Sequence, residues 1–181
     1  MKKLLLSAVF AAFMVVNTFA QDAGMNGSPT QEGNFLVEVN TGFGGAEGAW
    51  AHGANTGIGY TSQGDTSMLM IGGEGGYFIQ DDLAVKVGLG ISNDGDDTTV
   101  SYKIGGKYYV DSKYPVQADI TGSTYEIGNE SPLWFGLQAG YAYFVHHNVA
   151  IEPGVRFNTS LNDDFSDESV FELRVGFSMF F

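Results

Sequence analysis

The chain has 181 residues, 26 glycines, no cysteine and a formal charge of −13. Without cysteine it can form no disulfide, and it lacks the residue to which a lipoprotein's lipid anchor is attached. Its acidity excludes nucleic acid as a partner, because a phosphate backbone needs a basic surface. The high glycine and aromatic contents, with only four prolines, indicate a β protein and not a helical bundle.

Residues 1–20 have the pattern of a secretory signal peptide. Lys2 and Lys3 precede an apolar run from Leu4 to Val16, and the small residue Ala20 ends the segment. The run is shorter than the ~20 residues that cross a bilayer as a helix. We therefore expect export of the chain and cleavage after Ala20.

The remaining chain is long enough for one domain and has six basic against 21 acidic residues. Residues 21–33 are small or polar and have no periodicity, so we expect a flexible periplasmic tail there. The domain itself is expected to span residues 34–181.

Beyond residue 33, apolar side chains recur at every second position, which is the period of a β-strand. This pattern predicts eight strands, at residues 35–43, 67–78, 83–91, 100–108, 116–121, 133–143, 149–157 and 171–181. Short connections at 80–82, 111–113 and 146–148 alternate with connections through 44–66, 93–98, 127–131 and 162–168. Of these latter connections, only the one through residues 44–66 is plainly long. The predicted fold is an all-β, eight-stranded antiparallel up-and-down barrel with its short turns and termini in the periplasm.

Charge placement distinguishes this barrel from a soluble β-sandwich, whose strands also alternate. The polar face carries five acids and five bases, whereas the opposite face carries almost no charge. These ten residues are Glu38, Glu74, Lys86, Lys103, Lys107, Asp119, Glu152, Arg156, Glu172 and Arg174. The interior of a barrel of about eight strands is filled by side chains, and buried charges must be paired. We therefore expect an apolar face toward lipid and a lumen closed by a neutral, structural charge network.

The last eight residues, RVGFSMFF, resemble the C-terminal signal of outer-membrane barrels, with polar Arg174, then Gly176, apolar Met179 and a final aromatic residue, Phe181. The segment GYFIQDDLAVKVGLGIS resembles the strand, turn, strand unit of small barrels of the OmpX/OmpA-like group, especially those common in Bacteroidota. The resemblance implies the barrel fold, the outer membrane as location, and recognition of the last strand by the barrel assembly machinery. Because one fold serves many functions, it does not assign a specific role.

We expect a monomer in contact with outer-membrane lipid and lipopolysaccharide, with a structural or surface-interaction role and no cofactor or catalytic residue. An extracellular partner would bind at residues 44–66. The outer connections hold eleven acids and no base. Such carboxylates could gather Ca²⁺ or Mg²⁺, but NDGDD and NDDFSDE lack the full ligand pattern of a calcium loop, so we expect no dedicated metal site.

Two other functions stay open. In the first, the chain is a narrow channel for small solutes whose lumen is lined by Lys103, Lys107, Arg156 and Arg174. In the second, the chain is a lipid A modifying enzyme, as some eight-stranded outer-membrane barrels are. His52, Ser62 and Asp65 would then act near the outer rim, although no motif spacing fixes a general base there.

Overall fold

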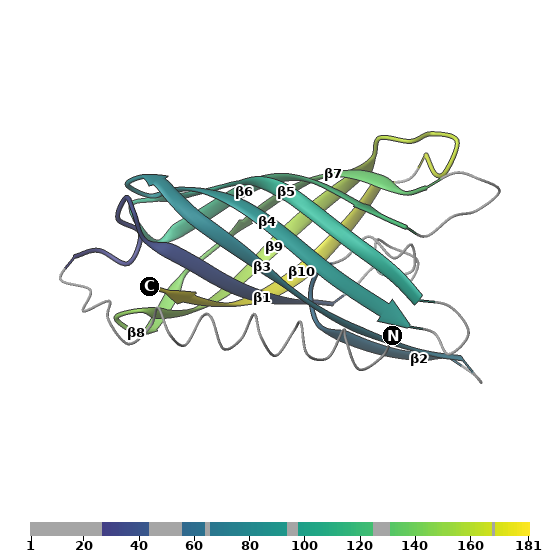
Figure 1. The fold of residues 1–181 in the computed structure, drawn as a ribbon, viewed down its shortest axis with the longest axis horizontal. Helices are drawn as coiled ribbons and strands as arrows, with labels where there is room; N and C mark the ends of the chain where they lie inside the picture. The colour runs from purple at the N-terminus through teal and green to yellow at the C-terminus, as the bar shows by residue number, and fades with distance from the viewer. Residues whose placement is uncertain (1–26, 44–55, 64–65, 94–97, 125–130, 168) are drawn as a thin grey trace.

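The computed structural model describes residues 27–43, 56–63, 66–93, 98–124, 131–167 and 169–181. Its strands are β1 (Phe35–Phe43), β2 (Gly59–Gln63), β3 (Thr66–Gln80), β4 (Leu83–Asn93), β5 (Thr98–Val110), β6 (Tyr114–Ser123), β7 (Leu133–Gly140), β8 (Tyr143–His146), β9 (Val149–Ser160) and β10 (Ser169–Phe180). Eight of them pair antiparallel in the ring order β1, β10, β9, β7, β6, β5, β4, β3, which closes where β3 pairs with β1 (Figure 1). The predicted eight-stranded barrel is confirmed. Within the described residues, no helix is long and apolar enough to cross a membrane.

Side chains along each strand alternate between the interior and the exterior of the barrel. In β4, Ala84 and Lys86 are buried while Val85, Val87 and Leu89 are exposed. Thirty large hydrophobic side chains of the described residues are exposed in this way. A soluble monomer rarely exposes a contiguous apolar surface of this kind, so this exterior suits hydrocarbon and not water.

Short turns join the strands at one end of the barrel, which we call the short-turn end. They lie at Asp81–Asp82, Asp111–Lys113 and His147–Asn148, where the sequence predicts them. The C-terminus lies at the same end, beside β8 (Figure 1). Asp82 and Asp111 have φ values of 64° and 50°, a left-handed conformation that Asp tolerates better than most residues. The opposite end, which carries the longer connections, is called the loop end below.

The connection predicted at residues 44–66 is only partly a loop. Residues 59–63 form β2, which pairs with β3, and the Ile58 N–H donates to the Asn40 carbonyl of β1 at 2.8 Å. Since β1 pairs with β3 only from Phe35 to Glu38, this segment continues the wall between the two strands toward the loop end. The alternation did not reveal it because only Ile58 and Tyr60 mark its outward face.

One predicted strand, residues 133–143, is interrupted. It is divided into β7 and β8 at Tyr141 and Ala142, opposite Pro153 of β9. A proline has no N–H to donate, so the ladder cannot continue regularly there. The Tyr141 N–H donates to the Pro153 carbonyl at 3.0 Å, and the Ala142 N–H turns to the Lys113 carbonyl at 2.7 Å.

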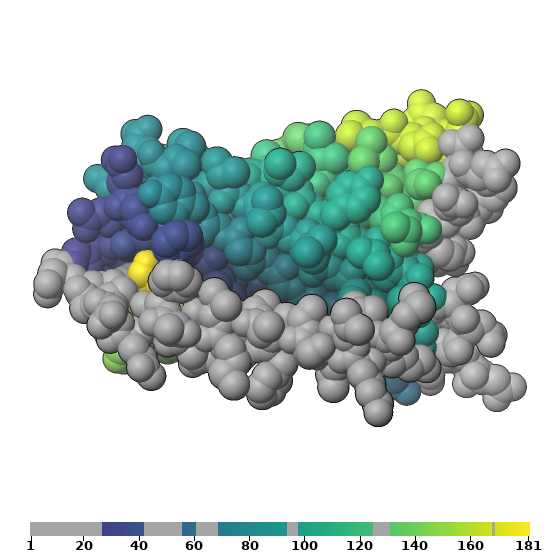
Figure 2. Space-filling view, viewed as in Figure 1, coloured from purple at the N-terminus to yellow at the C-terminus, as the bar shows by residue number. Residues whose placement is uncertain are grey.

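The residues before β1 form turns that close over the short-turn end, although we expected a flexible tail up to residue 33. Thr30 is buried, its hydroxyl donates to the Asp82 carboxylate at 2.5 Å, and the Asp82 N–H donates back to the Thr30 carbonyl at 2.7 Å. The Glu32 N–H donates to Asp81 at 2.9 Å. Figure 2 shows this part of the chain, in purple, packed at that end of the barrel. The predicted signal peptide, residues 1–20, lies outside the described residues.

Ile104 tests the lipid-facing exterior. It lies at the middle of β5 and is 58% exposed. Replacing it with arginine is expected to lower the free energy of unfolding in lipid vesicles by about 2–4 kcal/mol, because a charge would face the bilayer midplane. The matched change Leu161→Arg, at the loop end, should cost about 0–1 kcal/mol. Denaturant titration of both variants checks this, and equal small costs would contradict a lipid-facing wall.

Candidate functional site: an ion-paired lumen

The interior of the barrel contains all ten charged residues that the sequence analysis assigned to the polar face. They come from seven strands and are each 5% exposed or less. Among the described residues no other Asp, Glu, Lys or Arg is buried. Because five are acidic and five are basic, the interior carries no formal net charge.

Lys107 of β5 lies between two carboxylates that come from the opposite side of the ring. Its ammonium group pairs with Glu38 of β1 and with Glu152 of β9, the latter at 2.5 Å. The Tyr109 hydroxyl donates to the other oxygen of Glu152 at 2.9 Å, and the Lys107 Nζ lies 5.2 Å from the centre of the Tyr109 ring. These contacts cross the lumen and tie three strands together.

Lys86 of β4 extends the network toward the loop end. Its Nζ lies 3.1 Å from Glu38 and 2.9 Å from Glu74, which also pairs with Lys103 at 2.6 Å. The Thr56 hydroxyl donates to Glu74 at 2.8 Å, so the segment before β2 contributes to the interior. Each of these carboxylates therefore has more than one partner, which is what a buried charge requires.

Arg156 and Asp119 form the network's bidentate pair. The Arg156 Nη1 and Nη2 donate to the two oxygens of Asp119 at 2.7 and 2.6 Å, and its Nε donates to Asn158 at 2.7 Å. Gln117 joins this pair to the lysines, because it accepts from Lys86 at 2.8 Å and donates to Asp119 at 2.7 Å. Two parallel hydrogen bonds of this kind fix the guanidinium in one orientation.

Arg174 and Glu172 pair along one face of β10. The Arg174 Nε and Nη2 donate to the same Glu172 oxygen at 2.9 and 2.6 Å. Both side chains are buried. Glu172 lies opposite Arg156 of β9, and Val170, the next inward residue of β10 toward the loop end, packs with Trp134 and Phe165.

Glycines on neighbouring strands make room for these long charged side chains. A Cβ added at Gly136 would lie 2.0 Å from the Arg156 Nη2, and one added at Gly105 would lie 2.4 Å from Asp119. A large charged side chain therefore fits in the narrow lumen because the residue beside it on the neighbouring strand is a glycine, which has no side chain. Part of the chain's high glycine content serves this packing.

An apolar cluster closes the lumen at the short-turn end. It consists of Leu36, Phe78, Ala84, Tyr109, Ala142, Ala150 and Phe180, with Phe144 packed against it. The rings of Phe78, Tyr109 and Phe180 lie about 6 Å apart, a spacing typical of favourable aromatic pairs. The sequence analysis ended the predicted strand at residue 108 and therefore missed Tyr109 as an interior residue.

The residues of the resembled C-terminal signal lie on β10 and at its end. Arg174 and Gly176 face the interior, and β10 pairs with β1 from Leu36↔Phe180 to Phe43↔Leu173. Met179 is half-buried, and Phe181 lies on the exterior beside Phe35. This arrangement places the motif on the strand that closes the barrel, while its recognition by the assembly machinery stays a prediction.

The structure does not describe the side chains that were proposed for a lipid A modifying site. His52 and Asp65 lie outside the described residues, as does the side chain of Ser62. His146 and His147 are exposed at the short-turn end, with ring centres 4.2 Å apart. In the described part of the chain, no group of three or more His, Asp or Glu residues could hold a metal ion.

No protein-family model matches this chain, and no curated protein sequence matches it. Several solved structures are similar to this chain. The N-terminal β-barrel domain of Pseudomonas aeruginosa OprF is similar over 83% of this chain and 98% of its own, with 13% identity and a TM-score of 0.52. Neisserial surface protein A is 16% identical over 82% of this chain and 99% of its own, with a TM-score of 0.45. The closed antiparallel ring and the similarity to the OprF domain show that the chain has the fold of a small eight-stranded outer-membrane barrel.

Lys107 is the residue whose loss tests the pairing most sharply. Lys107→Met leaves two buried carboxylates short of a partner, and we expect a loss of about 3–5 kcal/mol in the free energy of unfolding. The double variant Lys107→Met with Glu152→Gln restores charge balance, and its glutamine can still accept from Tyr109. Denaturant titration in vesicles should find the double variant more stable than the single one. If the second substitution instead lowers the free energy of unfolding further, the result would argue against a network held by charge pairing.

Proposed function

We propose that this chain is a monomeric, non-enzymatic integral protein of the outer membrane, with a structural or surface-interaction role. One observation carries the proposal, namely an apolar exterior around a neutral, ion-paired interior. Only a closed barrel or a helix satisfies its backbone hydrogen bonds in hydrocarbon, and this chain is such a barrel. Its exterior would contact outer-membrane lipid and lipopolysaccharide.

The filled interior supports a structural role over conduction. Salt bridges cross the lumen from β1 to β5 and from β5 to β9. Below them, toward the short-turn end, the aromatic cluster around Phe78, Tyr109 and Phe180 is fully buried. A solute would have to separate buried ion pairs and displace these rings, and both steps are costly.

The loop end is the face that we assign to interaction. Short turns and a terminus at one end are typical of the periplasmic side of outer-membrane barrels, so the loop end would face outward. There Asp163, Asp164 and Asp167 are exposed, and the single basic residue of residues 34–181 outside the network, Lys113, lies at the opposite end. A partner at this surface would therefore be basic, or would bind through a divalent cation.

The plugged lumen predicts that the purified protein gives no step conductance in planar bilayers. If the narrow-channel alternative holds instead, discrete steps will appear. Lys103→Glu would then change their ion selectivity, because Lys103 projects into the lumen. A step conductance altered by Lys103→Glu would overturn the proposal.

The surface role is tested by trimming the loop end. Residues 44–55, 94–97, 125–130 and 162–167 are replaced with minimal turns, while residues 56–63 are kept because they belong to the wall. A strain with the trimmed barrel should reproduce the adhesion defect of a complete deletion but keep its envelope integrity. A control with asparagine at Asp163, Asp164 and Asp167 isolates the role of charge. Full rescue of both phenotypes by the trimmed barrel would place the function in the wall instead.

A further inference from the structure

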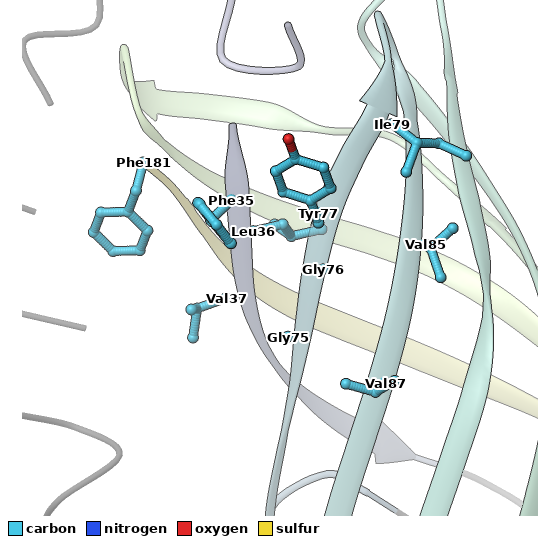
Figure 3. Close-up of a pocket in the computed structure, with 10 residues that line it drawn as sticks. All are labelled: Phe35, Leu36, Val37, Gly75, Gly76, Tyr77, Ile79, Val85, Val87 and Phe181. Atoms are coloured by element: carbon cyan, nitrogen blue, oxygen red, sulfur yellow. The ribbon is translucent and has the colours of Figure 1, made fainter. Parts of the chain in front are cut away.

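A groove of about 750 Å³ runs along the exterior of the barrel near the short-turn end. Its floor is the backbone of β3 at Gly75 and Gly76, and its sides are formed by residues of β1 and β4. Figure 3 shows the contrast between the side chains of Val37 and Val87 on either side and the bare backbone at the two glycines. A Cβ built at Gly75 would meet no atom within 4 Å, so the space above the backbone is open there and a side chain at this position would enter the groove.

The dimensions of the groove limit what can fill it. Adjacent strands lie about 4.8 Å apart, so the flanking strands β1 and β4 are about 10 Å apart. The side chains of Phe35, Val37, Val85 and Val87 narrow this space further. A helix with its side chains is about 10–12 Å wide and would not enter. A thin, flexible apolar chain fits.

The chemistry of the lining narrows the choice to a lipid. The side chains that line the groove are hydrocarbon, apart from the Tyr77 hydroxyl at the end nearest the short turns. Tyr77 packs against Phe35, with ring centres 5.1 Å apart, and is 44% exposed. A tyrosine with an apolar ring and a wet hydroxyl is suited to the depth at which acyl chains meet headgroups. The residues just before the described chain, QDAGMN, are too polar to occupy the groove themselves.

We propose that this groove binds one acyl chain of a phospholipid from the leaflet at the short-turn end, with the headgroup beside the Tyr77 hydroxyl. The inference rests on the proposed membrane location. It adds a defined lipid site to a wall that meets lipid mainly through protruding side chains. Where β3 lacks those side chains, the acyl chain supplies the packing contacts that an empty hollow would lose.

Native mass spectrometry of the protein in detergent micelles, titrated with palmitoyl-oleoyl phosphatidylethanolamine, tests the site. The wild-type chain should bind one phospholipid in preference to further ones. Gly75→Leu fills the groove and should weaken this binding by about tenfold, the equivalent of about 1.4 kcal/mol. Val87→Trp narrows the groove from β4 and should act in the same direction, which keeps the test informative if Gly75→Leu folds poorly.

Gly106→Leu is the matched control, because Gly106 is an outward-facing glycine of β5 that does not line the groove and has room for a side chain. It should bind phospholipid as the wild type does. Three results would each overturn the proposal. Gly75→Leu could bind phospholipid as tightly as the wild type, Gly106→Leu could weaken binding as much as Gly75→Leu does, or the wild type could form a dimer that Gly75→Leu dissociates. If the chain needs detergent to fold but binds no preferred lipid, the groove proposal fails while the membrane proposal stands.

Discussion

The pairing of buried charge is the constraint on which this structure depends. An unpaired ion in a low-dielectric interior costs several kcal/mol, so ten charged side chains can share a narrow lumen only if each meets its counterpart. The arrangement meets this demand with lysines that bridge two carboxylates and with one bidentate arginine pair. Because most of the partners come from different strands, their pairing also fixes the register of the wall.

Pairing in turn requires space, and the glycines supply it. Long side chains from one strand lie over bare backbone on the next, as Arg156 lies over Gly136 and Glu74 over Gly88. Where glycine faces outward instead, it leaves a hollow on the lipid side, as at Gly75. The same residue type thus has opposite consequences on the two faces. The interior becomes densely filled, and the exterior gains the groove that we assign to an acyl chain.

The sequence was sufficient to predict the barrel and the positions of its charges, because a period of two has only two possible facings. Once Glu172 and Arg174 shared a face opposite Phe171 and Leu173, their burial followed. Contacts between distant segments could not be predicted in this way. Nothing local shows that Thr56 reaches Glu74 or that Thr30 caps the turn at Asp82, since both depend on how the ring closes. The break at Tyr141 and Ala142 was not predicted, because Pro153, which lies opposite it on β9, fits the alternation of its own strand.

The most direct test of the account is whether the chain without its first twenty residues folds in plain buffer. An apolar exterior around an ion-paired lumen predicts aggregation without detergent, and a cooperatively folded β-structure, by circular dichroism and sedimentation, once detergent micelles or lipid vesicles are supplied. A folded monomer in detergent-free buffer would contradict it, because the thirty exposed hydrophobic side chains would then have to be buried in some other fold.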